Sequence, residues 1–130
     1  MPIASREALL GAAGKLRSER VPAPELGEGM EVLVREMTAA AREKFYAGLM
    51  IEDADDLDQH GNPKQKQRVG EIYARWVVFT AVNEDHSAMF AEADVGAVGK
   101  LPADLVARLA LAAKRLNGIG AEETEAARKN

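Results

Sequence analysis

The chain contains no cysteine, and this absence removes several classes of functional site. Zinc ribbons, iron–sulfur clusters, thiol nucleophiles and disulfide scaffolds all depend on cysteine. At 130 residues the chain is long enough to bury a core without such cross-links. We therefore expect a single domain spanning 1–130, in a reducing compartment.

A basic surplus and long apolar runs are missing as well. Asp and Glu outnumber Lys and Arg by 21 to 17, which gives a net charge of −4 and argues against a generic nucleic-acid binder. No apolar run approaches the roughly 20 residues that span a bilayer. Polar residues at Ser5, Arg6 and Glu7 come too early for a secretion signal. We expect neither a nucleic acid nor a membrane as partner.

Aromatic residues are scarce, at 5% of a chain that is 47% hydrophobic. Alanine accounts for much of the apolar content, and it favours helix while burying little area. The composition predicts a mainly helical fold with a thin core. Most of the six aromatic side chains, and Trp76 in particular, are expected in that core. They are Phe45, Tyr46, Tyr73, Trp76, Phe79 and Phe90.

Residues 1–17 predict a short N-terminal helix over 5–17. Ser5 is a suitable N-cap, and apolar residues follow at helical spacing. Gly11 and Gly14 weaken the helix by up to about 1 kcal/mol each. We expect it to form only by docking and to be mobile when alone.

Residues 18–36 predict a β-hairpin. Two prolines disfavour helix, a Gly-Glu-Gly sequence favours a turn, and an alternating apolar–polar segment follows it. The predicted strands lie near 19–26 and 30–36. The fold class is therefore α+β, mainly helical, with an N-terminal hairpin packed against three main helices and short terminal helices.

Residues 37–120 predict a helical core. One helix runs from a Thr38 cap to about residue 51, and a second from near Lys64 to about residue 81. Residues 77–82 are β-branched enough for a strand, but we favour helix there. We also expect a polar loop at 52–65 and a turn at 83–87 before the anchors Met89 and Phe90. A short helical turn, capped by Asp94, should end at Gly99. The last helix should have Pro102 at its first position and Asn117 at its end, and a frayed tail should follow at 121–130.

The most conspicuous polar feature is a run of carboxylates at Glu52, Asp53, Asp55, Asp56 and Asp58. An exposed acidic loop keeps a protein soluble, and it also offers a docking patch for a basic partner. Both interpretations stay open.

Part of this run imitates a calcium-binding loop. The order Asp56-x-Asp58-x-His60-Gly61 places acidic residues and a glycine as the first half of such a loop requires. The twelfth position, however, is Gln67 in place of a bidentate Glu. We therefore expect no bound metal.

Catalytic motifs are not evident. Ser5, Ser18 and Ser87 do not lie in a Gly-x-Ser-x-Gly elbow, and the glycines match neither a dinucleotide nor a Walker pattern. His60 and His86 lie in turns without a partner at ligand spacing. We expect no enzyme, cofactor or catalytic residue.

Three stretches carry a family resemblance. The first, Val32–Thr38, is a strand that ends in an Arg-Glu pair and leads to a threonine-capped helix. The second, Val82–Phe90, is an acidic turn that leads to an apolar-Phe anchor. The third is the ending, 115–130. Together, over residues 18–130, they resemble the tail assembly chaperone family of long, non-contractile-tailed phages and their prophages, although family members often have glycine where His86 stands.

The resemblance implies a non-catalytic interaction protein of the host bacterial cytoplasm that is absent from the finished virion. Its implied partner is the tape measure protein, which it keeps soluble while tail tube subunits polymerise. The tail tube protein and a second copy of the chain are further candidate partners. The chain would correspond to the shorter of two forms made by translational frameshifting.

The residues suggest where a partner would bind. Leu10 and Leu111 fall off the main apolar stripes of their helices, so we expect Leu9, Leu10 and Leu111 to contact a client. The alternative contact is the acidic group Asp53, Asp55, Asp56 and Asp58. Other functions remain open: a small acidic adaptor or regulator, a minor structural tail component, and a calcium-responsive module.

Overall fold

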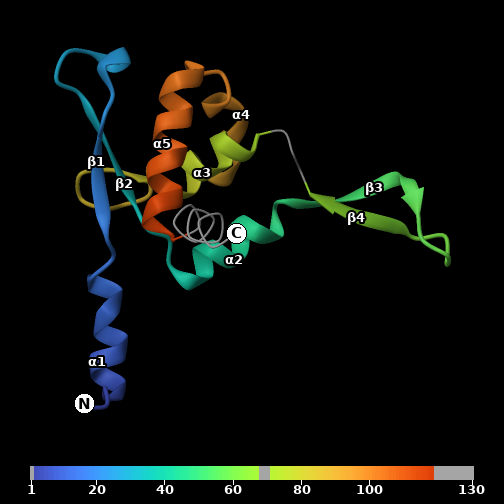
Figure 1. The fold of residues 1–130 in the computed structure, drawn as a ribbon, viewed down its shortest axis with the longest axis horizontal. Coiled ribbons are helices and arrows are strands. Elements are labelled where there is room, and N and C mark those ends of the chain that lie inside the picture. The colour runs from blue at the N-terminus through green and yellow to red at the C-terminus, as the bar shows by residue number, and fades with distance from the viewer. Residues whose placement is uncertain (1, 68–70, 119–130) are drawn as a thin grey trace, which may run out of the picture.

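Two segments project from the body of the molecule (Figure 1). The computed structural model describes the backbone of residues 2–67 and 71–118, and the side chains of 2–49, 55–64 and 71–118. One projection is helix α1 (Arg6–Leu10) with the 3-10 turn Gly11–Gly14 that follows it. The other is a hairpin of β3 (Met50–Leu57) and β4 (Pro63–Gln67).

The predicted N-terminal hairpin is confirmed, with shorter strands than expected. β1 (Ser18–Pro22) pairs antiparallel with β2 (Glu31–Arg35). β2 also pairs with β5 (Ala81–Val82), so it lies in the middle of the sheet. β1 ends at Pro22, and the chain then enters a 3-10 turn, Pro24–Leu26, because proline cannot donate to a strand ladder.

The core lies between this sheet and helices α3 (Ile72–Thr80) and α5 (Ala103–Leu116). Val21, Val34 and Ala81 face it from the sheet, and α5 buries one whole side against it. Trp76 is only 3% exposed, as the sequence predicted. The largest fully buried side chains are Phe45, Leu105, Val34, Val77, Val98 and Thr80.

Helix α2 (Ala39–Ala47) begins where predicted but ends early. The Thr38 hydroxyl accepts a hydrogen bond from the Ala41 amide at 3.1 Å, which confirms the predicted cap. The chain leaves the helix at Gly48 and enters β3 at Met50, so the predicted continuation to residue 51 is wrong.

The predicted polar loop at 52–65 and the helix start near Lys64 are wrong. β3 and β4 pair antiparallel, with Glu52 opposite Gln65 and Asp53 opposite Lys64. The register thus pairs an acidic stretch of sequence with a basic and polar one. Helix α3 begins only at Ile72.

Residues 77–82 combine the two structures considered for them, helix and strand. Helix α3 continues to Thr80, whose hydroxyl donates to the Trp76 carbonyl at 2.6 Å, and the chain then extends into β5. The predicted turn at 83–87 is confirmed by a hydrogen bond of 2.9 Å from the Asn83 amide to the Ser87 carbonyl.

Two of the six aromatic side chains are exposed, and one capping prediction holds only in part. Tyr46 and Tyr73 are exposed, because each lies on the solvent side of its helix. The short helix α4 (Val95–Val98) exists with Asp94 at its N-cap position, but the Asp94 side chain makes no capping hydrogen bond to it. Its carboxylate accepts from the Ala91 amide at 2.8 Å and closes the preceding 3-10 turn, Glu92–Asp94.

Helix α5 ends as predicted and begins one residue later than predicted. Pro102 is the N-cap instead of the first helical residue, and Asn117 is the C-cap. Gly118 follows with φ 78°, as expected for a glycine after a helix. The predicted tail at 121–130 lies outside the described residues. Within the described part of the chain, no helix has the length and apolar character needed to cross a membrane.

Candidate interaction surfaces

The N-terminal projection exposes apolar side chains that contact no core. Ser5 caps α1, since its hydroxyl accepts from the Ala8 amide at 3.1 Å. The α-helix ends at Leu10, earlier than the predicted residue 17, and a 3-10 turn continues to Gly14. Leu9 is 71% and Leu10 58% exposed, and neither α1 nor the 3-10 turn buries any residue. This segment therefore gains little from the rest of the chain.

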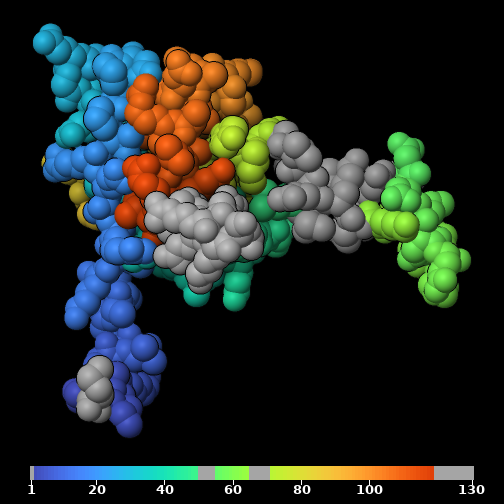
Figure 2. All heavy atoms as spheres, in the orientation of Figure 1, coloured from blue at the N-terminus to red at the C-terminus, as the bar shows by residue number. Residues whose placement is uncertain are grey.

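Helix α5 presents a second apolar row to solvent. Ala103, Ala107 and Leu111 are spaced by four residues, so they share one side of the helix, and all three are exposed. Leu111 is 55% exposed. Figure 2 shows α5, in orange and red, on the side of the body that faces the viewer.

A groove lies beside the first turn of this row. It has a volume of about 390 Å³ and its lining includes Ile72, Tyr73, Leu101 and Ala103. Tyr73 and Leu101 are both partly open to solvent. The groove and the row form one surface, the α5 face, which we define by Tyr73, Leu101, Ala103, Ala107 and Leu111.

Charged side chains border the α5 face. The Lys114 ammonium lies 5.1 Å from the centre of the Tyr73 ring, a cation–π arrangement. On the other side of Leu111, Arg108 binds both carboxylate oxygens of Glu25 at 2.9 and 2.8 Å. Hydrogen bonds from Arg108 hold the pKa of Glu25 down, from about 4.5 to about 2.

A further ion pair attaches α5 to the sheet. Arg115 lies 2.9 Å from a carboxylate oxygen of Glu19 on β1. Arg108 and Arg115 are thus engaged by the hairpin, and α5 is held against the sheet with its apolar row outward.

Two of the acidic residues predicted as a docking patch, Asp56 and Asp58, make contacts within their own hairpin. Asp56 pairs with Lys64 at 3.5 Å. The Asp58 carboxylate accepts from the His60 and Asn62 amides at 2.8 and 3.0 Å and so shapes the loop between the strands. Asp55 is exposed, and the Asp53 side chain lies outside the described side chains.

The structure does not bring the predicted contact residues together. Leu9 and Leu10 lie on one projection, the acidic residues on the other, and Leu111 on the body between them (Figure 1). Among the described residues, no group of three His, Asp or Glu side chains is placed to hold a metal ion.

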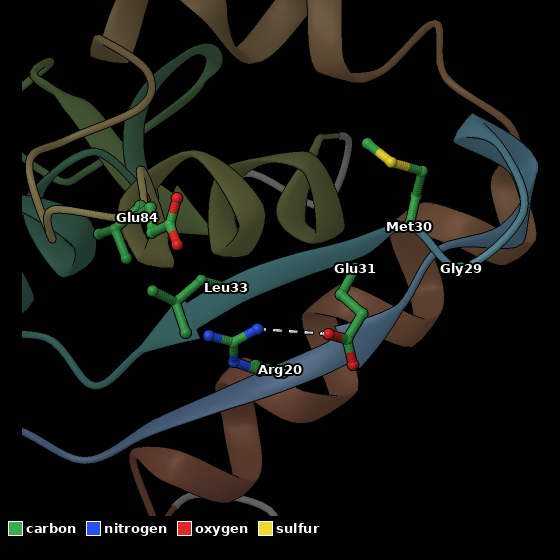
Figure 3. A pocket seen from close by; sticks show the side chains of 7 residues that line it. Arg20, Gly29, Met30, Glu31, Leu33 and Glu84 are labelled. Atoms are coloured by element: carbon green, nitrogen blue, oxygen red, sulfur yellow. Dashed lines mark ion pairs between the residues drawn. The ribbon is translucent and has the colours of Figure 1, made fainter.

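A shallow hollow lies on the sheet face that points away from α5 (Figure 3). It has a volume of about 270 Å³, and Arg20, Leu33 and Glu84 are in its lining. Arg20 and Glu31 pair across β1 and β2 at 3.5 Å, so opposite charges already neutralise each other there. Glu84 is then the remaining charged side chain in the lining.

Sequence reasoning found Leu111 but missed the rest of the α5 face. Tyr73 belongs to the aromatic residues expected mostly in the core, and Leu101 lies in a bend between α4 and α5. The four-residue spacing of Ala103, Ala107 and Leu111, on the side of the helix opposite its buried stripe, is a sequence signal that indicates this face.

Comparison with known proteins gives one family. The model of a family described as phage tail assembly chaperone matches residues 4–129. This range includes α1, which lies before the stretch 18–130 that carries the resemblance. No curated protein and no solved structure gives a match.

Proposed function

Since the chain belongs to the phage tail assembly chaperone family, we propose that it binds the tape measure protein through the α5 face. The chain keeps this client soluble while the tail tube assembles around it. The chemistry is non-catalytic: apolar side chains on the client are covered until assembly replaces the chaperone.

The exposed apolar row of α5 carries this proposal. The small side chains of Ala103 and Ala107 let the backbone of a client helix approach closely, and Leu111 inserts beside it. Fully burying a leucine contributes about 1.5–3 kcal/mol, so a few half-exposed side chains give a modest and reversible affinity.

Helix α1 is a second contact in this proposal. An isolated helix of five residues is marginal in water, and α1 buries nothing in the chain. Covering Leu9 and Leu10 with client surface would stabilise the helix and remove apolar area from water together.

The remaining parts of the proposal concern the cellular location of the protein and its further partners. The protein acts in the host bacterial cytoplasm and does not remain in the mature virion. The tail tube protein and a second copy of the chain are additional partners.

Co-expression with the tape measure protein of the same phage tests the proposal. We expect the client to be soluble and to copurify with the chain, and to aggregate when expressed alone. A client that is equally soluble without the chain, and that does not copurify with it, would contradict the proposal.

Two further measurements separate the competing functions. Mass spectrometry of purified particles should find no trace of the chain, whereas a structural tail component would be present. The double variant Asp55→Asn/Asp56→Asn should retain client copurification, whereas an acidic adaptor would lose its partner.

A further inference from the structure

We propose that a second pocket, separate from the α5 face, binds a partner segment in which an apolar side chain is flanked by carboxylates. The pocket lies between α2, the end of α3 and the segment after β5, and it has a volume of about 300 Å³. We call it the α2–α3 pocket and define it by Arg35, Ala41, Lys44, Phe79, Ala88 and Phe90. It does not depend on the proposed function.

The interior of the α2–α3 pocket is apolar. Ala41, Phe79 and Phe90 are each half-buried, so each packs one side on the core and turns the other to the pocket. Ala88 is exposed and completes the lining. A side chain of the size of Leu or Phe that entered here would leave water for apolar contacts on several sides.

The rim of the pocket carries positive charge. Lys44 is exposed and has no ion pair among the described residues. Arg35 donates to the His86 carbonyl at 3.0 Å through one nitrogen, which leaves its other donors for a ligand.

The one carboxylate in the lining is already neutralised. Glu92 lies 2.9 Å from the guanidinium of Arg75, whose side chain is 3% exposed. The charges of Arg75 and Glu92 therefore cancel. The two cations at the rim, Arg35 and Lys44, give the pocket a positive local charge, opposite in sign to the net charge of the chain. A ligand that combines a carboxylate with an apolar group complements both features.

A peptide titration tests the proposal on the full chain. The probe is a fluorescein-labelled peptide, Gly-Glu-Asp-Phe-Leu-Glu-Asp-Gly, followed by fluorescence anisotropy. The matched control peptide replaces its four acidic residues with lysine. We expect the acidic peptide to bind saturably and more weakly as salt rises, and the basic peptide not to bind.

Variants then locate the binding. Lys44→Glu should weaken binding of the acidic peptide about tenfold, because an attraction becomes a repulsion. Ala88→Glu should weaken it similarly by placing a carboxylate in the lining. Lys15→Glu makes the same charge change at an exposed lysine of the N-terminal projection and should have less than a twofold effect. Thermal unfolding monitored by circular dichroism verifies that each variant is folded.

Three results would overturn the proposal. They are equal binding of the acidic and basic peptides, equal weakening by Lys44→Glu and Lys15→Glu, and no binding of the acidic peptide at millimolar concentration. Loss of tape measure binding in the co-expression assay would leave this proposal intact, because the two assays use different surfaces and ligands.

Discussion

Gly48 leaves the space that the guanidinium of Arg75 occupies. A Cβ atom on Gly48 would overlap that guanidinium. Arg75 donates from there to the carbonyls of Phe45 at 3.1 Å and Lys44 at 2.9 Å, near the end of α2, and lies 4.7 Å from the centre of the Phe79 ring. A cation at a helix C-terminus is favourable with the helix dipole. The buried Arg75 side chain on α3 thus holds the end of α2 in place.

Gly48→Ala should therefore destabilise the protein. The added methyl group displaces the guanidinium from its acceptors, and we expect a loss of about 2–3 kcal/mol in the free energy of unfolding. Urea denaturation measures it. The matched control is Gly11→Ala, where nothing lies within 4 Å of the added atom, and we expect a change within about 1 kcal/mol. Equal effects of the two substitutions would contradict the role of Gly48.

Asn117→Ala should also lower stability. The Asn117 side chain accepts from the buried Met37 amide at 2.9 Å and donates to the Ala113 carbonyl at 2.7 Å, so it joins the end of α5 to the start of α2. Removing it leaves a buried amide unpaired, at a cost of about 1–3 kcal/mol. Chemical denaturation measures the loss, and Asn62→Ala, at an exposed turn position, is the control. A smaller effect at Asn117 than at Asn62 would exclude this link.

Glu25→Gln should reduce the sensitivity of the fold to acid. The pKa of Glu25 is about 2 in the folded protein because of its hydrogen bonds to Arg108, against an ordinary value of 4.5. As the pH falls, Glu25 is therefore protonated in the unfolded chain before it is protonated in the folded protein. The contribution of Glu25 to the free energy of unfolding is complete above about pH 4.5 and is lost as pH falls toward 2.

Melting temperatures recorded across this pH range measure the effect. They should fall less steeply in Glu25→Gln than in the wild type. Glu28→Gln, an exposed carboxylate in the same turn region, should keep the wild-type slope. Parallel curves for all three proteins would show that the Arg108 pair does not contribute.

His86→Gly should stabilise the turn at 83–87. His86 has φ 69°, in the left-handed region where a side chain is unfavourable. Glycine removes this strain but gains freedom in the unfolded chain, so we expect a net gain of about 0.5–1 kcal/mol. The contact from Arg35 goes to the backbone carbonyl and survives the substitution.

Thermal unfolding measures this gain, with His60→Gly as the control at a residue outside the left-handed region. The control should be neutral or slightly destabilising. Equal stability of His86→Gly and His86→Val would mean that the backbone conformation at this position carries no cost.

Local signals in the sequence were sufficient for several elements. The caps Ser5 and Thr38 accept the hydrogen bonds that their residue types predict. The hairpin at 18–36 follows from its turn and its alternating strand. Each of these features depends on residues close together in the chain, which is why sequence patterns detect them.

Features that depend on distant pairing were missed. Glu and Asp are depleted in strands, and the pairing of Glu52 with Gln65 and of Asp53 with Lys64 joins residues more than ten positions apart in the chain. Tyr73 matches the spacing of a buried stripe, yet α3 begins only at Ile72, so its first turn lies at the edge of the core. The α2–α3 pocket collects side chains from several elements, which no local pattern reports, whereas the row on α5 has a local spacing that indicates it.

Recovery of the tape measure protein with α5-face variants tests the central claim most directly. The double variant Ala107→Glu/Leu111→Gln changes only exposed positions, and Leu26→Gln, at a leucine that is 53% exposed on the β1–β2 hairpin, is the matched control. The amount of client recovered per chain is measured after co-expression, alongside the melting temperature of each variant. We predict at least about a tenfold loss for the double variant, equivalent to about 1.4 kcal/mol of binding free energy, with an unchanged melting temperature and full recovery for the control. Recovery that is equal for the wild type and the double variant would contradict the claim that the α5 face binds the client.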